Sequence, residues 1–110
     1  MTKEEIINSI KRLKVYYPYY YNNITKEDAK VIVDLWLELF GDLDNCYMQE
    51  AINTWGLRND KPPSIADLRK CIGISHSGID IEIKNCQDEQ RKNHLRKQKE
   101  ILWKFLVGGK

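Results

Sequence analysis

Two consecutive prolines, Pro62 and Pro63, interrupt this 110-residue chain and are followed at once by a helix start. Proline fixes the backbone and has no N–H to donate, so a helix cannot continue through the pair. Ser64 then supplies a helix cap, and Asp67 lies three residues further on, where its charge suits the first turn. We therefore expect a short helix over residues 64–73, directed across the ends of the helices before it.

Three amphipathic helices are predicted before the prolines. Thr2, Thr25 and Asp44 are their expected caps, while Pro18 and Gly41 end the first two. Apolar residues recur at helical spacing after each cap. The expected inner faces contain Ile6, Ile10, Leu13, Tyr17, Ala29, Ile32, Val33, Leu35, Trp36, Leu39, Phe40, Tyr47 or Met48, Ala51, Ile52 and Trp55. Together with the helix after the prolines, these segments predict an all-α, four-helix domain over residues 1–73.

Five tyrosines surround Pro18 between the first two helices. Each ring has a large apolar face and a hydroxyl that needs a partner, so we expect a structured connector whose rings close one end of the core. The alternative is an exposed aromatic surface, for a protein or for single-stranded nucleic acid. The absence of Lys and Arg between Val15 and Lys26 argues against nucleic acid.

The composition changes after Gly73. A brief alternation of isoleucines in residues 74–83 predicts a hinge. Cys86 is the only apolar residue in 84–94, so this stretch cannot bury a core of its own. Residues 84–110 are therefore expected to form a polar tail, flexible or helical. Residues 74–110 are also basic, with eight Lys and Arg against five Asp and Glu, whereas the first 73 residues have ten against eleven.

An apolar cluster follows the polar part of this tail and must dock on something. It either folds back on its own domain or enters a groove of another protein as a helix. The expected partner-binding residues are Ile101, Leu102, Trp103, Phe105 and Leu106. The candidate basic contacts are Arg69, Lys70, Arg91, Lys92, Arg96 and Lys97.

No pattern in the sequence indicates catalysis or a bound metal or cofactor. His76 and His94 have no close partner at metal-ligand spacing, and neither a phosphate-binding glycine loop nor a nucleophile elbow is present. Three cysteines without a CxxC pair are typical of reduced thiols in a cytoplasm. The chain has no apolar run long enough for a membrane span or a signal peptide. We expect a cytoplasmic protein that is not an enzyme and uses no cofactor or metal.

Four segments occur in an order that resembles a known family: YYPYYY, VIVDLWLELFGDL, MQEAINTW and KPPSIADLRK. Over residues 1–73 this order resembles the loader-and-inhibitor family of phage replicative-helicase loaders, found in replication modules of phages and prophages of Gram-positive bacteria. The resemblance implies a compact helical domain and a flexible tail that contacts the helicase. It further implies a non-enzymatic protein of the bacterial host cell that binds the hexameric replicative helicase and holds it inactive. Such a protein helps deliver the helicase to single-stranded DNA or to an origin-binding replisome organiser.

Two alternatives remain open at this point. The partner is instead the host's AAA+ helicase-loader ATPase, sequestered by the phage protein, or the chain is a DNA-binding replication or regulatory protein that uses the candidate basic residues. Residues 1–73 are net negative, and the helix pair before the prolines lacks an evident helix-turn-helix, which argues against DNA. We therefore expect at most weak, nonspecific DNA binding that falls steeply with salt.

Overall fold

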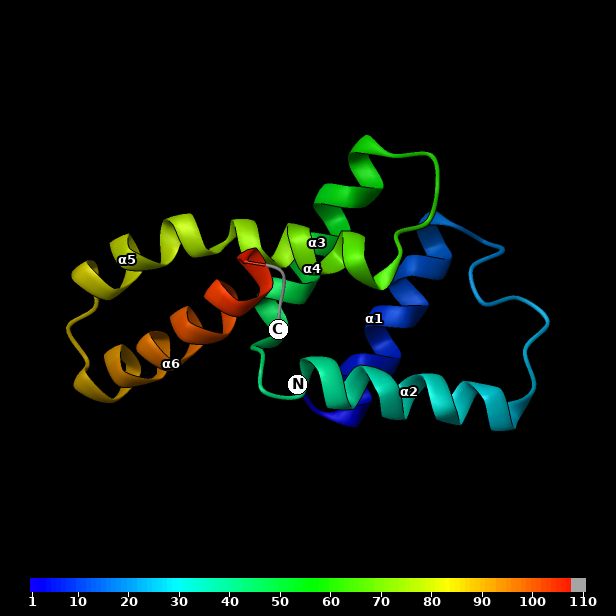
Figure 1. Ribbon diagram of the computed structural model, residues 1–110, viewed down its shortest axis with the longest axis horizontal. Helices are drawn as coiled ribbons and strands as arrows, with labels where there is room; N and C mark the ends of the chain where they lie inside the picture. Colours follow the sequence, from blue (N-terminus) through cyan, green and yellow to red (C-terminus); the bar gives the residue numbers. More distant parts are fainter. Residues whose placement is uncertain (108–110) are drawn as a thin grey trace. The chain divides into compact units, whose positions relative to one another are not determined.

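The computed structural model describes residues 1–107, and within them the chain is helical and contains no strand, which confirms the all-α prediction. Clustering of the backbone divides the chain into two compact units, one ending at Pro63 and the other beginning at Ser64 (Figure 1). The helices are α1 (Lys3–Tyr16), α2 (Lys26–Phe40), α3 (Asn45–Arg58), α4 (Ile65–Ile74), α5 (His76–Asn85) and α6 (Glu89–Leu106).

Side chain–backbone hydrogen bonds define the helix starts of the first unit. The Glu5 N–H donates to Thr2 Oγ1 at 3.1 Å, and the Thr2 N–H donates to Glu5 Oε1 at 2.8 Å, so the predicted capping box is present. Thr25 Oγ1 accepts from the Asp28 N–H at 3.1 Å. Each bond satisfies an N–H that has no partner inside its helix, which is why α1 and α2 begin at these residues.

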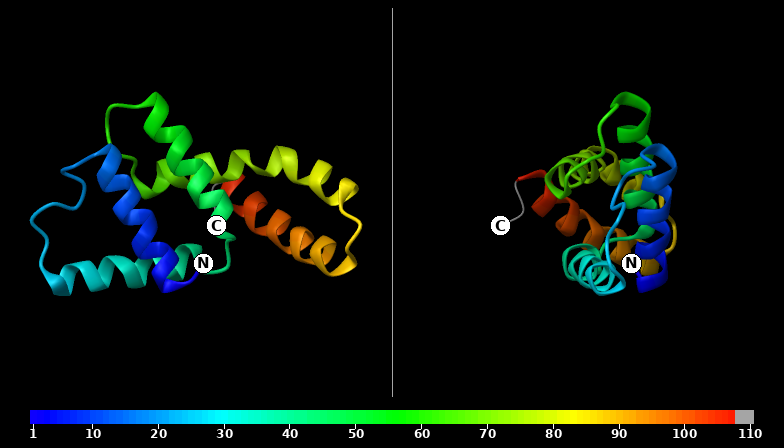
Figure 2. Two further views of the ribbon diagram at one scale, coloured as in Figure 1. Left: turned by 180° about the vertical axis from the view of Figure 1, so that it is seen from behind. Right: turned by 90° about the vertical axis from the view of Figure 1, so that its right-hand side faces the viewer.

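In the first unit α1 packs against both α2 and α3 (Figure 2). The side chains buried there include most of the predicted stripes: Ile6, Leu13, Trp36, Phe40, Tyr47, Met48, Ala51 and Ile52. The Trp36 and Phe40 rings meet edge to face, with centroids 5.4 Å apart. The prediction for Leu35 was wrong, because its side chain is 41% exposed on the outer side of α2.

Polar side chains join α1 to α3. Gln49 Nε2 donates to the hydroxyl of the buried Ser9 at 2.8 Å. One turn further along, Arg12 Nε and the Tyr16 hydroxyl both donate to Asn53 Oδ1, at 2.9 and 3.2 Å. Buried hydroxyls are expected to be hydrogen-bonded, and here the partners also fix the register of the two helices.

The tyrosine connector is structured, as expected, and it holds the loop that leads to the prolines. Tyr17 and Tyr20 are buried, whereas Tyr19 is 84% exposed. The Tyr17 hydroxyl donates to the carbonyl of Asn59 at 2.7 Å. Burial raises the pKa of the Tyr17 and Tyr20 hydroxyls, and Tyr21 beside Tyr20 raises the pKa of that hydroxyl further.

The second unit contains α4, α5 and α6, and α6 returns along the two helices before it (Figures 1 and 2). Ser64 and Asp67 form the capping box that begins α4, with reciprocal bonds of 3.1 and 2.9 Å. The buried side chains of this unit are Leu68, Ile72, Ile79, Leu95, Gln98, Leu102 and Phe105. The division of the chain therefore lies at the prolines, ten residues before the expected boundary at 73.

The expected hinge over 74–83 is largely helix α5. Ile79 is fully buried and Ile83 is half-buried one turn later, while Ile81 between them is 64% exposed. Spacing of four residues places Ile79 and Ile83 on one side of a helix, so the alternation was a helical stripe with an exposed member.

The stretch expected to be a polar tail is mostly helix α6, and its later half is packed. Leu95, Gln98 and Leu102 follow one another at intervals of three and four residues and are all buried. The polar residues of α6 occupy the remaining positions, so few apolar side chains suffice for packing.

Gly73, which was expected to end the fourth helix, lies inside α4 and is buried. A Cβ at this position would be 2.8 Å from the Cα and from the N of Leu106. These are backbone atoms, so a side chain would push α4 and α6 apart. The glycine therefore permits the close approach of the two helices.

Candidate partner-binding surface

The apolar cluster at the end of α6 is divided by burial. Leu102 is fully buried and Phe105 is 8% exposed, whereas Trp103 is 51% and Leu106 46% exposed; Ile101 is half-buried. Leu102 and Phe105 therefore take the fold-back alternative and belong to the core of the second unit. The expectation of a free five-residue anchor needs correction, because residues three and four apart on this helix face α4 and α5.

Trp103 lies at a shallow hollow of about 510 Å³ that it lines with His76, Lys99, Glu100 and Lys104; we call these five residues the Trp103 surface. The indole and the His76 ring are 5.2 Å apart at an interplanar angle of 50°. Lys99 Nζ and Asp80 Oδ1, 2.6 Å apart, join α6 to α5 beside it. A half-exposed indole ringed by charged side chains suits docking of another protein.

Two of the candidate basic residues lie on α4. The Arg69 guanidinium is over the Phe105 ring, 5.4 Å from its centroid, and is half-buried. This contact is a cation–π interaction that helps hold α6 on α4. Lys70 is exposed next to it in the chain.

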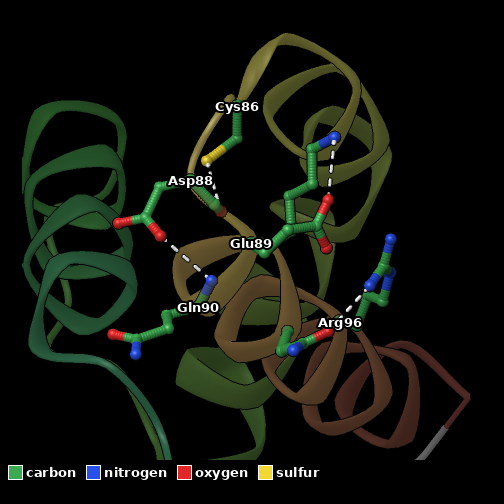
Figure 3. Close-up of polar contacts among 7 residues, drawn as sticks. Cys86, Asp88, Glu89, Gln90 and Arg96 are labelled. Atoms are coloured by element: carbon green, nitrogen blue, oxygen red, sulfur yellow. Dashed lines mark hydrogen bonds and ion pairs between the residues drawn. The ribbon is translucent and has the colours of Figure 1, made fainter.

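The other basic candidates lie toward the start of α6, where several contacts are local (Figure 3). Lys92 Nζ is 3.8 Å from Glu89 Oε1, and Arg96 Nη1 donates to Asn93 Oδ1 at 2.8 Å. Arg91 and Lys97 are exposed.

The six basic candidates do not form a single site. Arg91 lies about 21 Å along the axis of α6 from Phe105, the ring that Arg69 covers. The positive charges are spread along the helix instead of converging on one place.

The sequence interpretation missed a hollow of about 370 Å³ in the first unit, between α1 and α2. Its rim contains five exposed lysines: Lys3, Lys11, Lys14, Lys26 and Lys30. The spacing of 3, 11 and 14 places three of them on one side of a helix and was a usable signal. The side of α2 that faces them could not be inferred from α2's own sequence.

Within residues 1–107, no group of three or more His, Cys, Asp or Glu side chains is arranged to hold a metal ion. Across the same residues, no helix has both the length and the apolar character needed to cross a membrane.

Comparison with known proteins gives one match. Residues 1–69 match a family described as the N-terminal domain of the gene 39 protein, a stretch that contains all of α1–α3 and the first half of α4. No curated protein and no solved structure matches the chain. The family is that of a phage helicase-loader and inhibitor protein; it is non-catalytic and binds the replicative helicase. Because the match covers more than half of the 110 residues, this chain belongs to the gene 39 protein N-terminal-domain family of phage helicase-associated loaders and inhibitors.

Proposed function

We propose that this chain is a non-enzymatic phage replication protein that binds the hexameric replicative helicase of its bacterial host, keeps it inactive and helps load it at the origin. The family match over residues 1–69 is the observation that carries this proposal. A loader of this kind acts by binding alone, and an exposed apolar contact is the chemistry that such a protein needs.

We place the helicase contact on the Trp103 surface. Trp103 is the most exposed of the five residues expected to bind a partner, and Trp is strongly enriched among residues whose truncation costs most at protein interfaces. Leu106 and Val107, 46% and 57% exposed, add apolar area next to it in the chain. Leu102 and Phe105 contribute indirectly, because their burial fixes the position of α6.

Nothing in the arrangement of the basic residues favours DNA over the helicase. Arg69 is engaged with Phe105, Lys92 with Glu89 and Arg96 with Asn93, so three of the six candidates already have local partners. We keep the host AAA+ helicase loader as an outcome of the test below, because an apolar surface suits either ATPase.

The test compares binding of the full chain and of two variants to the purified host helicase hexamer by interferometry. Trp103→Ala should weaken binding by about tenfold or more, as expected when a hot-spot side chain is lost. The matched control is Tyr19→Ala, which removes another exposed ring, 84% exposed, from the first unit. Both variants should keep the melting temperature of the parent chain, because neither side chain is in the core.

Each result has a defined meaning. Equal affinities of the parent and Trp103→Ala for helicase would leave the helicase function in place and remove the Trp103 surface as its site. Absence of helicase binding by the parent chain, with binding to the host loader ATPase, would contradict the proposed partner. Inhibition is measured separately, as loss of helicase ATPase and unwinding activity on adding the chain.

A further inference from the structure

The hollow between α1 and α2 has an apolar floor within the first unit. Ile7 and Ile10 line it from α1, and Ile32 and Val33 line it from α2; all four are half-buried. Its volume, about 370 Å³, is within the range of ligand-binding clefts in proteins, about 300–1,000 Å³. The first unit therefore contains a hollow with room for a few large apolar side chains.

The rim of this hollow has one sign of charge. Five lysines and no carboxylate line it among the described residues. Within residues 1–107, none of these lysines is within ion-pair distance of an Asp or Glu. The positive potential at the rim is thus not neutralised by the protein itself, which favours an acidic ligand.

The positions of the lysines distinguish a chain of negative charges from a single anion. Lys3 and Lys14 are about 16 Å apart along the axis of α1, and Lys26 and Lys30 lie across the hollow on α2. A lone phosphate or carboxylate would need donors that converge on one point. Instead, these lysines match carboxylates distributed along a peptide.

The connector shapes one end of the hollow. Tyr21 lines it, with its ring centroid 4.2 Å from that of Tyr20 and its backbone at φ 53°. A bulky side chain rarely adopts this left-handed conformation, which costs about 1–3 kcal/mol. The buried neighbour Tyr20 holds the strained residue in place, so the end of the hollow is preformed.

We propose that this lysine-rimmed hollow is a docking site for an acidic amphipathic segment of a partner protein. Large apolar side chains of that segment enter between Ile7, Ile10 and Val33, while its Asp and Glu side chains meet the lysines. An apolar floor offers nothing to a phosphate backbone, so the observations favour a protein segment over nucleic acid. This site lies in the first unit and does not depend on the proposed helicase contact at Trp103.

The probe is an end-capped synthetic peptide of about 14 residues, long enough to follow α1, with leucines at helical spacing and glutamates on the flanks. Its matched controls are the same peptide with every glutamate replaced by lysine and a scrambled peptide of equal composition. Titration into the isotope-labelled full chain is followed by amide NMR signals. We expect saturable shifts at Ile7, Ile10 and Val33 with the acidic peptide and none at these residues with the lysine peptide.

Charge-reversal variants locate the binding energy. The double variant Lys11→Glu, Lys14→Glu should weaken binding of the acidic peptide by about fivefold or more, a size set by two exposed ion pairs. The control, Lys61→Glu with Lys84→Glu, makes the same change in net charge at two exposed lysines that do not line the hollow. It should leave the affinity within about twofold of the parent value, because surface charges far apart are screened.

Three outcomes would overturn the proposal. These are no saturable shift with the acidic peptide, equal binding of the lysine peptide, or an equal loss of affinity in both double variants. Tighter binding of a single-stranded oligonucleotide at the same amides would assign the hollow to nucleic acid instead. None of these results bears on binding of the helicase through Trp103, so the two proposals fail separately.

Discussion

The two units of this protein pack their helices with different materials. The first contains all six tyrosines and two of the three tryptophans, and it joins α1 to α3 through hydrogen bonds such as Gln49 to Ser9. The second contains no tyrosine and has an aliphatic core in which Leu68, Ile72 and Leu102 are fully buried. The second unit therefore depends on a few apolar positions, each of which carries a larger share of its packing.

This difference teaches that a polar composition does not by itself make a tether. Helix α6 begins with a run of charged and amide residues, yet it packs because Leu95, Leu102 and Phe105 fall on one side. The same sparse core should make the second unit the more sensitive of the two to single substitutions.

The largest expected effect separates two leucines of α6 that sequence alone treats alike. Leu102→Ala should lower the free energy of unfolding of the second unit by about 2–5 kcal/mol, because it leaves a cavity in a packed core. Leu106→Ala, at a side chain that is 46% exposed, should cost about 1 kcal/mol or less. Urea denaturation followed by amide signals of each unit measures both values. Similar, small losses for the two variants would indicate that α6 is not packed.

A smaller effect is expected where α4 meets α6. Gly73→Ala places a Cβ 2.8 Å from backbone atoms of Leu106, so the helices must move apart, at a cost of about 1–3 kcal/mol. Gly78→Ala is the control, because nothing lies within 4 Å of its Cβ inside α5. It should be neutral or stabilising by up to about 1 kcal/mol, since Ala is the better helix former. The two melting temperatures should therefore shift in opposite directions, and a common direction would break the comparison.

The smallest effect distinguishes the units by pH. Burial raises the pKa of Tyr17 and Tyr20 above the ordinary value of 10.0, so the folded first unit favours the neutral hydroxyls. Their contribution to stability is fully present below pH 10 and is lost as the pH rises above it. Amide signals of α1–α3 should report unfolding at a lower urea concentration at high pH. Replacing Tyr20 by Phe should reduce this dependence; an unchanged dependence in that variant would assign it to other groups.

Much of the first unit follows from local patterns in the sequence. The caps at Thr2, Thr25 and Ser64 were predicted because a cap is a contact between residues three apart. Helical spacing also identified the buried Trp36 and Ile52. The lysine-rimmed hollow was not predicted, because it depends on which sides of α1 and α2 face each other.

The second unit was missed for physical reasons that particular residues illustrate. Gln98 occupies a buried position in the stripe of α6, so the apolar spacing is broken in the sequence. Gly73 looked like a helix end, whereas its missing side chain serves the contact with Leu106 on a distant helix. Both features involve partners more than 20 residues away, which no local pattern can reveal. The five-residue anchor was consequently predicted as one surface, although burial divides it.

Native-state hydrogen exchange of the free chain tests most directly whether α6 is packed or tethered. Amides of α5 and α6 between Ile79 and Phe105 should exchange far more slowly than unstructured ones, with Leu95 and Leu102 among the slowest in the second unit. Leu102→Ala should remove that protection in α4–α6 and leave α1–α3 protected. Fast exchange throughout residues 76–106 of the parent chain, beside slow exchange in α1–α3, would contradict the account and restore the tether.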